Sequence, residues 1–126
     1  MKTKIATLTG AALAYAVALA DGQKPHAMVE PDYGQQRQRE VYVAVNLGPG
    51  SHEVYTVDGR RADDVIDREK ISTMVDHSGV WVAYMGYNLN DERLHMSAGA
   101  TRREAAMRCY VASRLGKDVE IPEQLL

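Results

Sequence analysis

Residues 9–22 have the sequence TGAALAYAVALADG, and this stretch decides the fold that we expect for the 126-residue chain. Residues 11–20 consist mainly of alanine, which has the highest helix propensity. Thr9 is a favourable N-cap residue, and Gly22, preceded by Asp21, suits the left-handed position that follows a helix. The stretch therefore predicts a helix that begins after Thr9 and ends at Asp21-Gly22.

This predicted helix has no polar face. Leu13 and Val17 lie on one side of a helical wheel, Tyr15 and Leu19 lie on another, and alanines fill the rest. A helix that is apolar all round is usually buried on more than one side. We expect it to be a core helix, and the alternative is that it forms a homodimer interface.

The start of the chain also has features of a secretory signal peptide. Its first residues are basic, and Ala18-Leu19-Ala20 fits a small-x-small cleavage site. However, Gly10 interrupts the apolar run, and the unbroken part is far shorter than the ~20 residues that span a membrane. Cys109, the single cysteine, excludes an internal disulfide and favours a reducing compartment. We therefore predict a cytoplasmic protein without membrane association, or a secreted or periplasmic one if residues 1–20 are cleaved.

The middle of the chain has the pattern of antiparallel strands. Alternating, β-branched or aromatic residues mark four short runs, which are residues 41–47, 54–57, 71–75 and 80–85. Turns such as Gly48-Pro49-Gly50-Ser51 join neighbouring runs, which predicts a four-stranded antiparallel meander. Residues 62–70 fit a helical turn or a loop. Residues 23–39 and 86–100 have loop composition, and we expect the first of these loops to be mobile.

Residues 101–116, with the sequence TRREAAMRCYVASRLG, predict a second long helix. Thr101 and Glu104 have the spacing of a capping box, and Gly116 is a typical helix stop. We therefore expect one α+β domain over residues 1–126. In it, an antiparallel sheet of about four strands packs with the N-terminal and C-terminal helices on the same face.

Arg108 is the most informative position of the C-terminal helix. It projects from the middle of an apolar arc that includes Cys109 and Val111, where an unpaired buried charge is too costly. Glu104 lies one turn earlier, in the favourable acid-before-base order, so a simple pair on the helix surface is one interpretation. Our sharper hypothesis is that Arg108 reaches into the body of the domain and fixes the helix register through an acidic residue there.

The charge and the polar motifs exclude several functions. Fifteen basic against seventeen acidic residues leave a formal charge of −2, which lacks the overall positive field of a dedicated nucleic-acid-binding protein. The four histidines show no metal-ligand spacing. Asp76-His77-Ser78 contains the letters of a hydrolase triad, but three adjacent turn residues do not converge as a triad must. We predict no metal, no cofactor and no catalytic residue.

Two segments carry a family resemblance: residues 8–13, LTGAAL, and residues 105–116, AAMRCYVASRLG, which VEIP follows at 119–122. They resemble the NinX-like proteins, a small phage and prophage family of unknown function. The chain departs from the family pattern at Ala14-Tyr15, where the family tends to carry an acidic residue and then tryptophan. The resemblance implies a cytosolic accessory protein of phage or prophage origin, and it implies no catalytic residues.

We expect this protein to be a non-enzymatic module that binds a host or phage protein. Exposed aromatic residues tend to carry binding energy, and the candidate surface is Trp81, Tyr84 and Tyr87 together with the 23–39 segment. Core filling is the alternative for Trp81. The alternative function is association with nucleic acid through Arg37, Arg39, Arg60, Arg61, Arg102 and Arg103. A small hydrolase or nucleotide-processing enzyme is a third hypothesis, to which no motif points.

Overall fold

The computed structural model describes residues 1–29, 41–85 and 95–126. Its helices are α1 (Gly10–Ala20), α2 (Arg60–Glu69) and α3 (Arg102–Leu115). Its strands are β1 (Lys2–Lys4), β2 (Pro25–Val29), β3 (Val41–Gly48), β4 (Ser51–Tyr55), β5 (Ser72–Val75), β6 (Trp81–Met85), β7 (His95–Gly99) and β8 (Asp118–Glu120). Short 3₁₀ turns lie at Ile5–Thr7 and Glu123–Leu125.

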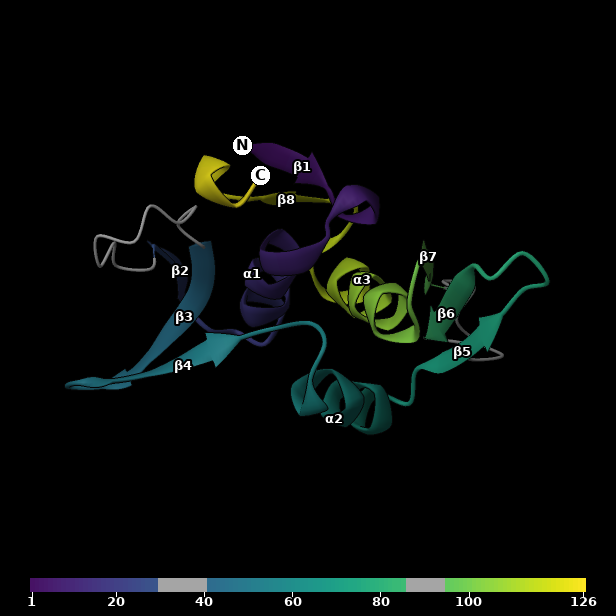
Figure 1. The fold of residues 1–126 in the computed structure, drawn as a ribbon, viewed down its shortest axis with the longest axis horizontal. Coiled ribbons are helices and arrows are strands. Elements are labelled where there is room, and N and C mark those ends of the chain that lie inside the picture. The colour runs from purple at the N-terminus through teal and green to yellow at the C-terminus, as the bar shows by residue number, and fades with distance from the viewer. Residues whose placement is uncertain (30–40, 86–94) are drawn as a thin grey trace, which may run out of the picture.

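Within the described residues the strands form three antiparallel sheets (Figure 1). One sheet has the order β2-β3-β4, another has the order β5-β6-β7, and β1 pairs with β8. The predicted α+β class is confirmed, but the prediction of one four-stranded sheet is wrong. The physical reason is that α2 lies between the two expected hairpins in the chain, so that each hairpin pairs with a further strand instead of with the other hairpin.

The two further strands come from segments that we expected to be loops. β2 lies within the predicted 23–39 loop, and residues 30–39 of that loop lie outside the described residues. β7 lies within the predicted loop at 86–100. Each pairs along five positions with a strand that the sequence did predict, β3 and β6 respectively. The sequences of β2 and β7 have little strand pattern, so each of these strands forms by pairing with its predicted neighbour.

The two long helices lie at the centre of the molecule, between the two three-stranded sheets (Figure 1). α1 contacts β2, β3 and β4, α3 contacts β5, β6 and β7, and the two helices contact each other. They do not share one face of one sheet, as we had expected, because each three-stranded sheet has its own helix. The β1-β8 pair joins the two ends of the chain, and α2 packs on α3.

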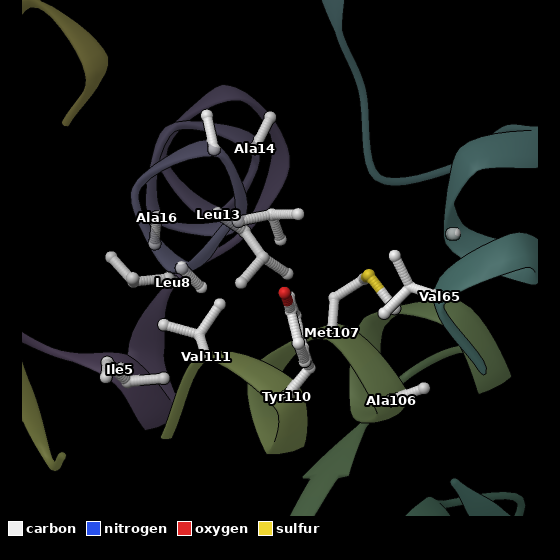
Figure 2. Packing of buried hydrophobic residues seen from close by; sticks show 14 of the residues in the cluster. Ile5, Leu8, Leu13, Ala14, Ala16, Val65, Ala106, Met107, Tyr110 and Val111 are labelled. Atoms are coloured by element: carbon white, nitrogen blue, oxygen red, sulfur yellow. The ribbon is translucent and has the colours of Figure 1, made fainter. Parts of the chain in front are cut away.

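α1 is buried along nearly its whole length. Leu13, Ala16 and Val17 are each at most 1% exposed. In Figure 2, Leu13 lies between the two helices together with Tyr110 and Val111 of α3. The prediction of a core helix is therefore confirmed, whereas the homodimer interface stays a prediction.

The C-terminal end of α1 has the geometry that its sequence predicted. Gly22 has a φ of 79°, and its N–H donates to the carbonyl of Leu19 at 3.0 Å. The N–H of Gln23 donates to the carbonyl of Ala18 at 3.0 Å, which completes a Schellman motif. At the other end, Thr9 occupies the N-cap position, but its side chain makes no capping hydrogen bond. Burial, rather than N-capping, therefore stabilises the start of this helix.

α3 begins with a cap that differs slightly from the predicted capping box. Thr101 Oγ1 accepts a hydrogen bond from the Glu104 N–H at 3.1 Å, as predicted. The Glu104 carboxylate, however, accepts from the N–H of Ala100 at 3.2 Å, one residue before the N-cap. Two backbone donors at the helix start are thus satisfied, and the Glu104 carboxylate is held close to Arg108.

Arg108 connects three parts of the fold. Its Nε donates to the carbonyl of Leu8 at 2.9 Å, and its Nη1 donates to the carbonyl of Ala98 on β7 at 2.8 Å. Its Nη2 lies 3.0 Å from Glu104, and the side chain is 11% exposed. Arg108 reaches into the body of the domain through two backbone carbonyls, not through the acidic residue that we expected there. Leu8 lies outside the helices and strands, and Ala98 lies in an edge strand, whose outer side has no ladder partner, so both carbonyls can accept these bonds.

Candidate functional site

The exposed face of the β5-β6-β7 sheet is the first candidate site. α3 packs on this sheet, and the strand registers place six side chains on the opposite side: Ser72, Tyr84 and Met96 in one row, Met74, Val82 and Ala98 in the next. We name these six residues the outer face. Met74 and Met96 are 55% and 58% exposed, and the Tyr84 hydroxyl lies 3.0 Å from the Met74 sulfur. None of the six residues is charged, although the solvent side of an antiparallel sheet is usually polar.

The aromatic residues that we predicted for a partner surface point in different directions. Tyr84 belongs to the outer face. Trp81 lies three positions earlier on the same strand, so it points to the other side of the sheet, where it is half-buried against the hydrophobic core. Tyr87 lies outside the described residues. The structure therefore places Tyr84, but not Trp81, on an exposed apolar surface.

Four of the six arginines that we predicted to contact nucleic acid lie at the start of two different helices. Arg102 and Arg103 begin α3, where Arg102 Nε donates to Thr73 at 3.1 Å. Arg103 binds both carboxylate oxygens of Asp63 on α2, at 2.7 and 3.0 Å, and this pairing holds the pKa of the Asp63 carboxyl below its usual value. The other candidates are Arg60 and Arg61 at the start of α2, and Arg37 and Arg39, which lie outside the described residues.

A polar pocket lies where the end of α1 meets α2, α3 and β4. Its volume is about 500 Å³, and we name it the Asp21 pocket. Charged and phenolic side chains dominate its lining, and they include Asp21, Tyr55, Arg61, Arg68, Tyr110 and Arg114. The pocket thus collects side chains from the end of α1, from β4, from α2 and from α3.

The Asp21 carboxylate is the central acceptor of this pocket. The Tyr110 hydroxyl donates to Oδ1 at 2.5 Å, and the Tyr55 hydroxyl donates to Oδ2 at 3.4 Å. Arg68 Nη2 donates to Oδ1 at 3.4 Å. Figure 2 shows the Tyr110 hydroxyl directed from α3 towards α1. One carboxylate therefore connects the end of α1 with β4, α2 and α3.

The two phenols of the pocket are hydrogen-bond donors at neutral pH. Burial, followed by the hydrogen bond to Asp21, raises the pKa of Tyr110 to about 12. Burial and the negative charge of Asp21 also raise the pKa of Tyr55. Guanidinium groups lie over both rings, with Arg61 4.0 Å from the Tyr55 centroid and Arg114 5.5 Å from the Tyr110 centroid. The rings thereby hold these two arginines at the pocket.

Sequence reasoning assigned Asp21 only to the end of a helix and missed the pocket. A carboxylate at that position faces the negative end of the helix dipole, which is unfavourable unless nearby donors compensate. Arg68, Tyr55 and Tyr110 supply those donors. The acidic residue at the helix end was therefore a usable signal, but its partners come from three other elements and are found only from the fold.

The other side chains considered for chemistry, among the described residues, have structural rather than catalytic surroundings. Among the described residues, no three His, Cys, Asp or Glu side chains are placed to hold a metal ion. Cys109 is fully buried, and burial raises the pKa of its thiol to about 11. Asp76 accepts the N–H groups of Ser78 and Val80 at 2.8 and 3.0 Å, which is the bonding of a turn. Within the described ranges, no helix has the length and apolar character needed to cross a membrane.

Comparison with known proteins assigns the chain to a family. Residues 4–114 match the family described as Bacteriophage P22, NinX. No curated protein matches the chain. The matched residues include α1, α2 and both three-stranded sheets, so the match covers the fold and not only the two segments that first showed the resemblance. The chain therefore belongs to the NinX family of phage proteins.

Proposed function

We propose that this phage protein is a non-enzymatic accessory module whose outer face binds a partner protein of the host or the phage. The observation that supports the proposal is the uncharged character of all six outer-face positions, with Met74 and Met96 more than half exposed. Contiguous exposed apolar residues on a folded domain are typical of interaction sites. The free, buried Cys109 supports a cytoplasmic site of action.

The composition of the outer face indicates the chemistry of its partner. Because the face has no charge, it offers no cation to a phosphate backbone or to an acidic peptide, and an apolar protein surface suits it best. Methionine side chains can adapt their shape to such a surface. Tyr84 adds a large ring with a polar tip, which is favourable at the centre of an interface.

The test is affinity capture by the immobilised full-length chain from extracts of phage-infected cells, with matched variants. Tyr84→Lys and Met96→Lys each place a charge on the outer face. Leu47→Lys is the control, because Leu47 is 61% exposed on β3 of the other sheet. We expect a protein that the parent chain and the Leu47→Lys variant retain and that both outer-face variants lose.

The captured protein is then purified and titrated against the same variants by calorimetry. Loss of a central contact residue typically weakens binding by about tenfold or more, and we expect this for Tyr84→Lys and Met96→Lys only. Equal retention by all variants would refute the outer face as the binding site. Melting curves of the variants show whether each has kept its fold.

A further inference from the structure

The arginines of the Asp21 pocket have more hydrogen-bond donors than the surrounding residues use. Each guanidinium has five N–H donors. Arg68 bonds through Nε and Nη2, Arg114 bonds through Nη2, and Arg61 pairs with Glu53 through Nη2. Among the described residues, no acceptor bonds the Nη1 groups of these three arginines or the Nε groups of Arg61 and Arg114. These donors require acceptors from water or from a ligand.

The three carboxylates of the pocket are already bonded: Glu53 pairs with Arg61, and the other two are also largely covered. Asp21 accepts three hydrogen bonds, and Glu69 Oε1 accepts from Arg68 Nε at 3.2 Å and from Arg114 Nη2 at 3.0 Å. The side chains of Asp21 and Glu69 are 14% and 19% exposed, whereas those of Arg68 and Arg114 are 55% and 51% exposed. Arg68 and Arg114 are therefore the most exposed of the pocket's paired charged side chains, and Glu53, at 35% exposed, is paired with Arg61.

We propose that the Asp21 pocket binds an oxyanion of the phosphate class, with Arg61, Arg68 and Arg114 as donors. Planar pairs of guanidinium N–H groups match the oxygens of a phosphate better than a lysine does. Arg61 and Arg114 are held over tyrosine rings, so less freedom is lost when they bind.

The size of the pocket indicates what else the ligand carries. About 500 Å³ lies within the range of ordinary small-molecule sites and exceeds the volume of a bare phosphate. The pocket can therefore accept a small phosphate ester as well as inorganic phosphate. This site shares no residue with the outer face, so the inference does not depend on the proposed protein-binding function.

The test uses NMR titration of the full-length chain with inorganic phosphate and, separately, with glycerol phosphate at constant ionic strength. We expect saturable shifts at the pocket residues. Arg114→Gln should weaken binding by about tenfold or more, because it removes charged donors. Arg102→Gln is the matched control, since Arg102 is an exposed arginine of the same helix that faces Thr73 instead, and it should leave binding unchanged.

Glu69→Gln gives a prediction of the opposite sign. It removes a negative charge next to the ligand, so binding should tighten by about fivefold. If Arg114→Gln does not fold, Arg61→Gln should show the same weakening.

Tighter binding of glycerol phosphate than of inorganic phosphate supports an ester ligand, and equal binding supports the free anion. Unsaturable shifts, equal weakening by Arg102→Gln and Arg114→Gln, or weaker binding by Glu69→Gln would overturn the proposal.

Discussion

Lys70 is the single non-glycine residue with a positive φ among the described residues, at 53°. It follows α2 in the left-handed position, which is strained for a residue with a Cβ and is usually occupied by glycine. We predict that Lys70→Gly raises the free energy of unfolding by about 0.5–1 kcal/mol. Urea denaturation measures the change, with Lys24→Gly as the control at a residue whose φ is not positive. An equal gain at Lys24, or a loss at Lys70, would contradict this account.

Tyr110 predicts how stability depends on alkaline pH. The fold raises its pKa from 10 to about 12, so the unfolded chain loses the phenolic proton first. The stabilisation is complete below pH 10 and is lost as the pH rises through about 12. Tyr110→Phe should lower stability at neutral pH, because the donor to Asp21 is removed, and should flatten the decline above pH 10. Denaturation at several pH values measures both effects. In Tyr84→Phe, whose hydroxyl contacts only a sulfur among the described residues, the decline should remain.

At the level of elements, β7 and α3 approach each other closely at Gly99. A Cβ atom at Gly99 would lie 2.6 Å from the backbone nitrogen of Ala105, which is closer than side-chain atoms normally approach. We predict that Gly99→Ala lowers the free energy of unfolding by about 1–3 kcal/mol, because the strand and helix must separate. Gly59→Ala, where the added atom meets a side chain at 3.4 Å, is the control for urea denaturation and should have a smaller effect. Equal effects would show that the close approach is unimportant.

Arg108 joins α3 to β7 and to the segment before α1. Arg108→Gln removes a charged donor from two carbonyls and leaves the Glu104 carboxylate without its cation, so we predict a loss of about 2–4 kcal/mol in the free energy of unfolding. Arg102→Gln, at an exposed position of the same helix, should cost less than about 1 kcal/mol. Thermal and chemical denaturation compare the two variants. A loss for Arg108→Gln no larger than that for Arg102→Gln would remove its proposed role in fixing the helix register.

At the level of the whole molecule, local signals in the sequence predicted some elements and missed others. Alanine content and the Asp21-Gly22 stop located α1, and the cap at Thr101 located α3, because these signals lie within the elements. β2 and β7 have little pattern of their own and form by pairing with β3 and β6, which only the folded chain brings near them. The division into two sheets was missed because α2, whose residues fit a helical turn or a loop equally well, separates the hairpins.

The candidate sites likewise contain a part that one element's sequence predicts and a part that only the fold creates. Tyr84 was predicted as a surface aromatic from its strand, but the uncharged rows around it depend on the register of three strands. The Asp21 pocket draws its side chains from α1, β4, α2 and α3, which are widely separated in the sequence. The sequence predicted which side chains a single element carries, but not which side chains from different elements come together in the fold.

Native-state hydrogen exchange on the full-length chain tests the central claim, that α1 is the core helix on which the β2-β3-β4 sheet, α3 and the Asp21 pocket are assembled. The backbone amides of residues 14–20 should exchange only when the whole domain unfolds. Their protection should therefore correspond to the same free energy as the global unfolding measured with denaturant. Exchange of these amides as fast as in an unstructured peptide, while those of α3 and β3 remain protected, would contradict the account.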